Sequence, residues 1–288
     1  NSFCQQIGVT SNRLIQKVNS MMNKLPISAF IVSKNEGHLL ENCIKSVLFC
    51  NELIVVDLKS SDNTVEIAKK YGAKILSIEP LPVIEMIHQK HITEVKNNWV
   101  LITDPDEVTS PELAKEIHDD FISFNNSIEI GVVDVPLVYY FKSHQLKGTS
   151  WGGIKNRAYL IHKDRYVFTS NVHNGRFLKE GFIKHTIENT GKNHIHHYWM
   201  QGYKQIFEKH FRYLKNEGKS RFEQGFRTSF FTILQIPFHQ FFNCYFKARG
   251  FKDGFTGVFL SLFREWYFTA ANIELYKYQK AANKKRSN

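Results

Sequence analysis

Residues 52–64 read ELIVVDLKSSDNT, and this stretch decides the fold that we expect. Its first six residues form an apolar run that ends on a carboxylate, Asp57, which is typical of a buried strand. A polar turn follows, and the spacing of Asn63 and Glu66 predicts a capping box at the start of a helix that Gly72 ends. The stretch therefore predicts a strand–turn–helix unit with an acidic side chain at the end of its strand.

Apolar runs of the same kind stand on either side of this unit. Residues 27–33 (ISAFIVS) and 99–103 (WVLIT) predict two further buried strands, and residues 37–50 carry apolar side chains at helical spacing. Ser110 followed by Pro111 is a typical helix start, with serine as the N-cap and proline in the first turn. The alternation predicts an α/β fold, a mostly parallel sheet flanked by helices on both faces.

An acidic run, DPDE at residues 104–107, directly follows the strand over residues 99–103. Two carboxylates at positions i and i+2 can reach one hard cation, and Mg²⁺ or Mn²⁺ prefers such oxygen ligands. Asn35 and Asp57 fall at or near the ends of the two other strands, where open α/β sheets bind their ligands. We expect one crevice to collect these side chains. The alternative interpretation is an acidic loop that only caps the helix at Ser110.

Two common phosphate-binding motifs are missing from the sequence. It has no GxGxxG after the first expected strand and no GxxxxGK[ST] at any position. A dinucleotide-dependent dehydrogenase and a P-loop kinase are thereby disfavoured. A nucleotide site would have to be built from strand-end carboxylates and a metal ion.

The charge is distributed unevenly along the 288 residues. The formal net charge is +11, but residues 201–288 contain 16 lysines and arginines against 6 acidic residues, and they hold 15 of the 24 phenylalanines. We therefore expect three segments: an N-terminal extension or non-native residues at 1–24, a catalytic domain over 25–200, and a basic, phenylalanine-rich helical extension over 201–288. Within the extension we expect a helix break at Pro237.

The extension carries the apolar segment 226–246, which has few charges and is followed by Lys247, Arg249 and Lys252. This pattern favours an amphipathic helix in a membrane interface, with the cations facing anionic lipid. A helical subdomain packed on the rest of the chain, or a homo-oligomer interface through the C-terminal helices, are the alternatives. We expect no nucleic-acid partner, because the net charge is accompanied by no recognisable nucleic-acid-binding motif.

Other features bear on the compartment. No run of about 18 apolar residues predicts a membrane-spanning helix, and the first 24 residues lack the apolar core of a signal peptide. The four cysteines have neither disulfide-framework nor metal-site spacing, which favours a reducing, cytoplasmic compartment. The histidines near residue 195 show no zinc-site spacing, and we expect His194 and His196 to be core or hydrogen-bonded residues.

A family resemblance rests on four segments in order. They are ISAFIVSKNEG (27–37), ELIVVDLKSSDNTVEIAKKYGA (52–73), HQKH (88–91) and NWVLITDPDEVTSPELA (98–114). Together they resemble the family 2 glycosyltransferases with a GT-A fold, and most of all the bacterial branch that adds glucose or related sugars to lipopolysaccharide core and other surface glycans. The resemblance is close over residues 25–120. It continues more loosely through the WGG turn at 151–153, Val172-His173, His197-Tyr198 and the tail FKARGFKDGFTG (246–257).

The resemblance implies roles for individual residues. Donor binding would fall to Asn35, Glu36, Asp57 and Asp62 at the nucleobase and ribose, to Lys90 at the phosphates, and to Asp104. The metal, Mn²⁺ or Mg²⁺, would be bound by Asp106 as the more direct ligand, by Asp104, and by His197 as a late metal or diphosphate contact. Glu107 would orient this set, contact the acceptor or act as the base.

The resemblance also implies an inverting reaction, in which a carboxylate removes the proton of the attacking hydroxyl. The branch often has His-Glu where this chain has His173-Asn174, and an asparagine cannot act as a base. Glu107, His173 or Glu180 would then have to accept the proton. The alternative is a catalytically weak or inactive member that acts as a binding or scaffold subunit.

We therefore expect a glycosyltransferase that moves a sugar from a nucleotide-sugar, with UDP as the favoured nucleotide. The expected acceptor is a lipopolysaccharide, a lipid-linked sugar or another surface glycan. The expected location is the cytoplasm, peripheral on the inner face of the cell membrane.

Overall fold

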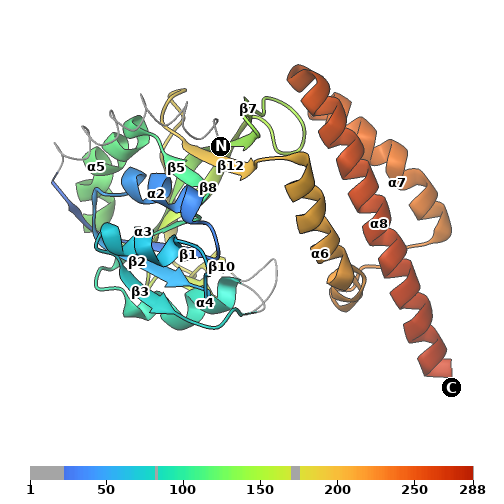
Figure 1. Cartoon of the computed structure of the whole chain (residues 1–288), viewed down its shortest axis with the longest axis horizontal. Helices are drawn as coiled ribbons and strands as arrows, with labels where there is room; N and C mark the ends of the chain where they lie inside the picture. The colour runs from blue at the N-terminus through green and yellow to red at the C-terminus, as the bar shows by residue number, and fades with distance from the viewer. Residues whose placement is uncertain (1–22, 82–83, 170–175, 288) are drawn as a thin grey trace. The chain divides into compact units, whose positions relative to one another are not determined.

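The computed structural model describes residues 23–81, 84–169 and 176–287 (Figure 1). The elements in chain order are β1 (Leu25–Ser33), α2 (Gly37–Ser46), β2 (Cys50–Asp57), α3 (Thr64–Lys70), β3 (Lys74–Ser77), α4 (Ile84–His91), the 3₁₀ turn η1 (Ile92–Glu94), β4 (Trp99–Thr103), β5 (Glu107–Thr109), α5 (Pro111–Asn126), β6 (Ile130–Phe141), β7 (His144–Gln145), β8 (Ile154–His162), β9 (Tyr166–Phe168), β10 (Arg176–Leu178), β11 (Ile183–Thr186), β12 (Ile195–Met200), α6 (Tyr203–Glu223), α7 (Phe230–Phe242), the π-helical turn η2 (Asn243–Lys247), the 3₁₀ turn η3 (Gly250–Asp253) and α8 (Gly254–Ser287).

The chain divides into two compact units. The sheet unit contains the chain up to Val138 and Ile154–His197, and the helical unit contains Tyr139–Gly153 and Tyr198–Asn288. This division differs from the expected one, because residues 139–153 join the C-terminal helices. The expected catalytic domain over 25–200 and extension over 201–288 remain a proposal, and most of segment 1–24 lies outside the described residues.

The main sheet has the strand order β3-β2-β1-β4-β8-β6-β12-β5, with β7 and β11 also paired to β6. The first four of these strands are parallel, as the apolar runs predicted. From β8 onward most of the pairing is antiparallel. The α/β class is confirmed, and the antiparallel strands extend the parallel sheet that the first half of the sequence encodes.

Helices cover both faces of the parallel strands. Successive side chains of a strand point to opposite faces, so Phe30, Ile54 and Val100 share one face, where they pack in one core with Ile87 of α4. On the opposite face the ring of Trp99 meets that of Phe124 on α5 at 5.0 Å between centroids. Burial of these side chains on two sides explains why β1, β2 and β4 are apolar almost without interruption.

The carboxyl ends of β1, β2 and β4 lie side by side. Ser33 pairs with Asp57 across β1 and β2, and Ile31 pairs with Thr103 across β1 and β4. Asn35, Asp57 and Asp104 therefore follow three neighbouring strands at one edge of the sheet, as expected. This edge is where ligands bind in sheets of this kind.

One expected helix cap is confirmed and one is wrong. The hydroxyl of Ser110 accepts a hydrogen bond from the backbone N–H of Leu113 at 3.1 Å, so it is the N-cap of α5. Asn63 makes no capping bond, because its backbone (φ −78°, ψ 14°) lacks the extended conformation typical of a capping residue. The carboxylate of Asp62 instead accepts from the N–H of Thr64 at 3.0 Å.

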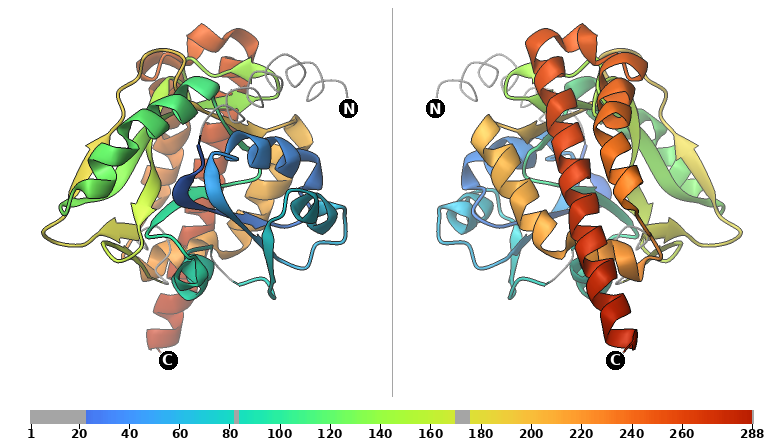
Figure 2. Two further views of the ribbon diagram at one scale, coloured as in Figure 1. Left: turned by 90° about the vertical axis from the view of Figure 1, so that its left-hand side faces the viewer. Right: turned by 90° about the vertical axis from the view of Figure 1, so that its right-hand side faces the viewer.

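In the helical unit, α8 packs against both α6 and α7 (Figure 2). A core of Phe141, Leu146, Met200, Ile206, Leu260 and Phe263 holds the unit together. The expected break at Pro237 is wrong, because α7 continues through this residue. The proline removes one backbone donor, and packing against α8 keeps the helix intact. Within the described ranges, no helix combines the length and apolar character that crossing a bilayer requires.

The carboxylate of Asp253 holds the loop between β7 and β8. It accepts hydrogen bonds from the backbone N–H groups of Lys147 and Gly148, each at 2.7 Å, and lies 3.0 Å from the ring of His144. A side chain at Gly148 would stand 2.0 Å from the carbonyl oxygen of Arg249, so only glycine permits this approach. The loop that carries the WGG turn is thereby joined to the tail motif FKARGFKDGFTG.

Candidate active site

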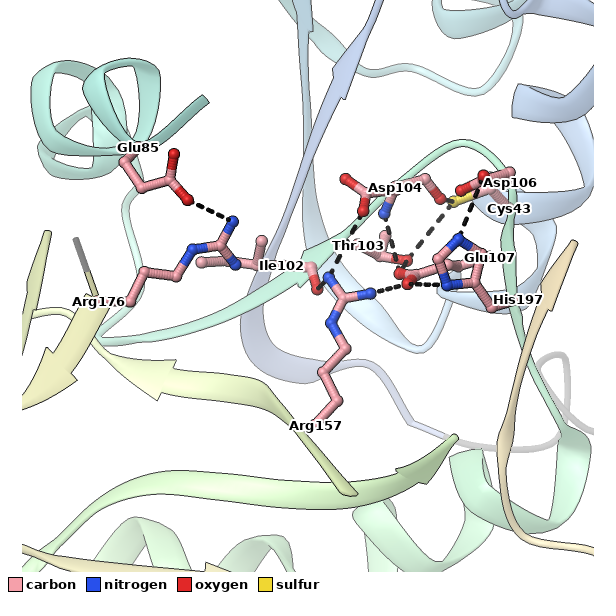
Figure 3. Close-up of polar contacts among 10 residues, drawn as sticks. All are labelled: Cys43, Glu85, Ile102, Thr103, Asp104, Asp106, Glu107, Arg157, Arg176 and His197. Atoms are coloured by element: carbon pink, nitrogen blue, oxygen red, sulfur yellow. Dashed lines mark hydrogen bonds and ion pairs between the residues drawn. The ribbon is translucent and has the colours of Figure 1, made fainter. Parts of the chain in front are cut away.

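The acidic run after β4 meets a histidine from a distant part of the chain. Glu107 begins β5, and the antiparallel register of β5 and β12 places His197 directly opposite it. The ring nitrogen Nε2 of His197 lies 3.3 Å from the carboxylate of Asp106, and Nδ1 lies 3.5 Å from that of Glu107 (Figure 3). Of the expected site residues, Asp104, Asp106, Glu107 and His197 therefore form one group.

Glu107 is the buried centre of this group. Its oxygen Oε2 accepts hydrogen bonds from the hydroxyl of Thr103 at 3.0 Å and from the backbone N–H of Asp104 at 3.1 Å. Its oxygen Oε1 forms an ion pair with Arg157 and contacts His197. The side chain is fully buried. Both carboxylate oxygens are thus engaged by protein groups.

Arg157 is the residue of this group that sequence reasoning missed. It lies on β8, and its guanidinium also donates to the carbonyl oxygen of Ile102 at 3.2 Å and lies 3.9 Å from the carboxylate of Asp104. The available signal was its position in a strand, two residues before the fully buried Tyr159 on the same face. A charged side chain at such a position indicates a buried partner of opposite charge.

The loop after β4 is also held from α2. The thiol of Cys43 donates to the carbonyl oxygen of Asp104 at 3.3 Å. Burial is the main reason why the pKa of this thiol lies far above its usual range, and the charges of Asp104 and Asp106 raise it further. The thiol therefore stays protonated and keeps its hydrogen bond to the loop.

A second group of expected residues joins the two loops that follow β1 and β2. The side-chain oxygen of Asn35 accepts from the backbone N–H of Ser61 at 2.7 Å, and the N–H of Asn35 donates to the hydroxyl of Ser60 at 2.9 Å. Asn35 has a left-handed backbone (φ 56°), a conformation that asparagine adopts more readily than most residues. Asp57 is buried and accepts from the N–H of Ser60 at 3.2 Å.

Asp62 makes a further connection between the same loops. Its carboxylate accepts from the backbone N–H of Gly37 at 3.0 Å and from the hydroxyl of Thr64 at 2.5 Å, while the N–H of Glu36 donates to the Thr64 hydroxyl at 3.2 Å. Desolvation raises the pKa of Asp62, but the hydrogen bonds to its charged form outweigh this and lower it below the usual value. The carboxylate is therefore a charged clamp at the start of α2 and α3.

The remaining expected residues are more scattered. Lys90 lies exposed in the last turn of α4. His88 of the same helix is buried between the rings of Phe30 and Phe168, and burial, followed by the charge of Arg176, lowers its pKa to about 3. His173 and Asn174 lie outside the described residues, and Glu180 is exposed in the turn after β10.

The chemistry of the first group suits a divalent cation. It presents two carboxylates and an imidazole, and the side chains of Asp104 and Asp106 are 40% and 18% exposed. In the part of the chain that the structure describes, no group of three or more histidine, cysteine or acidic side chains is arranged to hold a metal ion by itself. Mg²⁺ and Mn²⁺ commonly take few protein ligands and complete their shell with phosphate oxygens and water.

Several known proteins are similar to this chain or to part of it. Glucosyl-3-phosphoglycerate synthase from Mycobacterium tuberculosis, crystallised with Mn²⁺ and UDP-glucose, is 19% identical with a TM-score of 0.33 over 45% of this chain and 48% of that one. A Rickettsia bellii protein described as an uncharacterized glycosyltransferase is 30% identical over 246 residues, which cover 80% of this chain and 79% of that protein.

The lipopolysaccharide core biosynthesis glycosyltransferase LpsC of Rhizobium meliloti is 25% identical over 278 residues, which cover 93% of this chain and 97% of that protein. The model of glycosyl transferase family 2 matches residues 28–211, which include the strand-end loops, the acidic run and His197. The chain therefore belongs to glycosyl transferase family 2.

Proposed function

We propose that this protein transfers a sugar, with inversion, from a UDP-sugar to a lipopolysaccharide, a lipid-linked sugar or another surface glycan. Membership of family 2 and the similarity to LpsC support sugar transfer to such an acceptor. The observation that carries the proposal is the convergence of Asp104, Asp106 and His197 at the carboxyl end of β4, beside the ends of β1 and β2.

The donor would bind across the strand ends. We assign the nucleobase and ribose to Asn35, Glu36, Asp57 and Asp62 at the ends of β1 and β2. The contacts of Asn35 and Asp62 support a role in holding this part of the proposed donor site together, because their oxygens already accept hydrogen bonds across it. Lys90 is exposed, which suits the proposed contact with the donor phosphates.

Asp106, Asp104 and His197 are the proposed ligands of Mn²⁺ or Mg²⁺. When bound, the cation offsets the negative charge that develops on the departing diphosphate. Glu107 would orient this set, since it contacts His197 and the backbone of Asp104. Both of its oxygens are engaged, which favours this orienting role over the role of a base.

In the proposed reaction the acceptor hydroxyl oxygen forms a bond to the anomeric carbon while the bond from that carbon to the diphosphate oxygen breaks. The hydroxyl proton passes to a base of the protein. Because both oxygens of Glu107 are engaged, we assign this role to His173. It directly precedes Asn174, the position where the resembling branch often has a glutamate. Loss of transfer in His173→Gln with unchanged UDP binding is the expected result, and unchanged transfer would refute the assignment.

A second candidate function is a binding or scaffold subunit without catalysis, and Asn174 is the observation that favours it. A transfer assay with a panel of nucleotide-sugars and a lipopolysaccharide acceptor, with and without Mn²⁺, separates the two. We expect turnover that requires the metal, is lost in Asp106→Asn and persists in Asp119→Asn, a matched change of an exposed acid on α5. Binding of UDP without any turnover would instead support the scaffold function.

With such an acceptor, the proposed location of the protein is the cytoplasm, peripheral on the inner face of the cell membrane. A lipid-linked or lipopolysaccharide acceptor is carried by a membrane. The protein would then need a surface that holds it there.

A further inference from the structure

Helix α7 presents an apolar face that no described part of the chain covers. All thirteen of its residues are described, and none of them is buried. The exposed large apolar side chains of α7 and the adjoining segments are Phe226, Phe230, Phe231, Leu234, Phe238, Phe242, Phe246, Phe251 and Phe255. We call this set the phenylalanine face. Its most exposed members are Phe231 (75%), Phe238 (80%) and Phe255 (77%).

The other side of α7 is already used. Gln240 accepts a hydrogen bond from the Nε of Arg264 on α8 at 3.1 Å, and Ile233, Ile236 and Phe241 are half-buried. This contact fixes which side of α7 faces outward. A surface helix normally carries polar side chains on its outward side. The outward side of α7 includes the polar Gln235 and His239, but phenylalanines dominate it, which indicates a second, apolar environment.

The exposed charges of the segment that carries α7 are of one sign. No acidic residue occurs between Glu223 and Asp253, and the carboxylate of Asp253 is buried in its contacts with the β7–β8 loop. Four exposed cations lie in the same segment, namely Arg227, Lys247, Arg249 and Lys252. They stand before and after α7, so that basic side chains flank the apolar helix at both of its ends.

Exposed aromatic rings flanked by basic side chains favour one kind of binding partner, a membrane surface with anionic lipids. Anionic headgroups neutralise basic side chains, while aromatic rings enter the boundary between headgroups and acyl chains. A second copy of the chain docked on the same face would bring cations against cations. We propose that the phenylalanine face binds the surface of a membrane that carries anionic lipids. The inference rests on the proposed function in one respect, since an acceptor carried by a membrane gives the protein a reason to bind there. Membrane binding itself is measured without sugar transfer.

Co-sedimentation of the full chain with vesicles tests the apolar part of the proposal. We expect stronger binding to vesicles of phosphatidylcholine mixed with phosphatidylglycerol than to phosphatidylcholine alone. The double variant Phe231→Gln/Phe238→Gln should bind on the order of tenfold more weakly for each side chain changed. The matched control Ile122→Gln/Ile128→Gln changes two equally exposed apolar residues of the sheet unit (71% and 81%) and should bind as the unchanged protein does.

The same assay tests the charges. Lys247→Gln and Lys252→Gln should each weaken binding to the anionic vesicles about fivefold, and added salt should reduce the difference. Lys204→Gln and Lys219→Gln are the control, because these exposed lysines of α6 pair with Glu208 and Glu223 and lie outside the acid-free segment. An equal loss in these controls would show a general charge effect and overturn the proposal.

Sedimentation velocity and UDP binding, measured on the same samples as vesicle binding, separate the remaining outcomes. Equal binding to neutral and anionic vesicles, or unchanged binding of the Phe231→Gln/Phe238→Gln variant, overturns the proposal. So does a dimer in sedimentation velocity that the double variant abolishes, since the face would then join two copies of the chain. UDP binding is followed in parallel: its absence in every protein, with lipid binding intact, contradicts the proposed function and leaves this inference standing.

Discussion

The guanidinium of Arg157 on β8 forms an ion pair with the fully buried carboxylate of Glu107 on β5. The same guanidinium lies 3.9 Å from Asp104, and Glu107 also contacts His197. One arginine thus compensates the charge of Glu107 and also lies near Asp104, one of the proposed metal ligands. The pair connects the antiparallel part of the sheet to the strand-end loop of the parallel part.

Removing the arginine should leave an unpaired buried charge. We expect Arg157→Met to lower the free energy of unfolding by about 3 kcal/mol, measured by urea denaturation. The double variant Arg157→Met/Glu107→Gln should recover most of this loss, because the neutral amide needs no cation. Both variants should lose transfer activity, since Asp104 and His197 lose their orientation. If the single variant unfolds with the free energy of the unchanged protein, Arg157 does not compensate the charge of Glu107.

The clamp formed by Asp62 should hold together the proposed donor site at the ends of β1 and β2. Asp62→Ala removes the acceptor for the backbone N–H groups of Gly37 and Thr64, which should lower stability by about 1–2 kcal/mol. Asp62→Asn keeps one acceptor oxygen, so its stability should lie between that of Asp62→Ala and that of the unchanged protein. We expect the KM for the UDP-sugar to rise in the same order, as measured by initial rates. Asp119→Ala is the control on the exposed face of α5, and a KM unchanged in Asp62→Ala would contradict the clamp.

The buried His88 and the half-buried His196 should make the stability of the protein sensitive to mild acid. Burial lowers the pKa of His88 to about 3 and that of His196 to about 4, from an ordinary value of 6.5. Below pH 6.5 the unfolded chain takes up protons that the folded protein excludes, so stability falls as the pH drops from 6.5 towards these values. Each histidine contributes up to about 1.4 kcal/mol per pH unit.

Urea midpoints between about pH 7.5 and 5 measure this slope. His88→Leu removes one of the histidines whose pKa is lowered by burial and should make the dependence of stability on pH shallower. Parallel curves for His88→Leu and the unchanged protein would show that His88 is not held in its neutral form.

The sequence predicted the parallel half of the fold well because its signals are local. The apolar runs that end at Ser33, Asp57 and Thr103, and the cap at Ser110, depend on neighbours within a few residues. The alignment of the three strand ends then follows from parallel pairing.

The features that local sequence signals failed to predict depend on contacts between distant segments. Arg157 meets Glu107 across 50 positions of sequence, and no spacing rule connects them. The cap at α3 moved from Asn63 to Asp62 because Asp62 also accepts from the N–H of Gly37, the first residue of α2. Helix α7 runs through Pro237, where its packing on α8 compensates for the lost backbone donor. In each case tertiary contacts outweighed the local preference.

Calorimetric titration with UDP tests the central claim most directly, because it measures donor binding without the acceptor or the base. The unchanged protein should bind UDP in the presence of Mn²⁺, and binding should weaken on the order of tenfold or more when the metal is removed or when Asp106 is replaced by asparagine. Asp119→Asn should bind as the unchanged protein does. UDP affinity that is the same with and without Mn²⁺ and unaltered in Asp106→Asn would contradict the account.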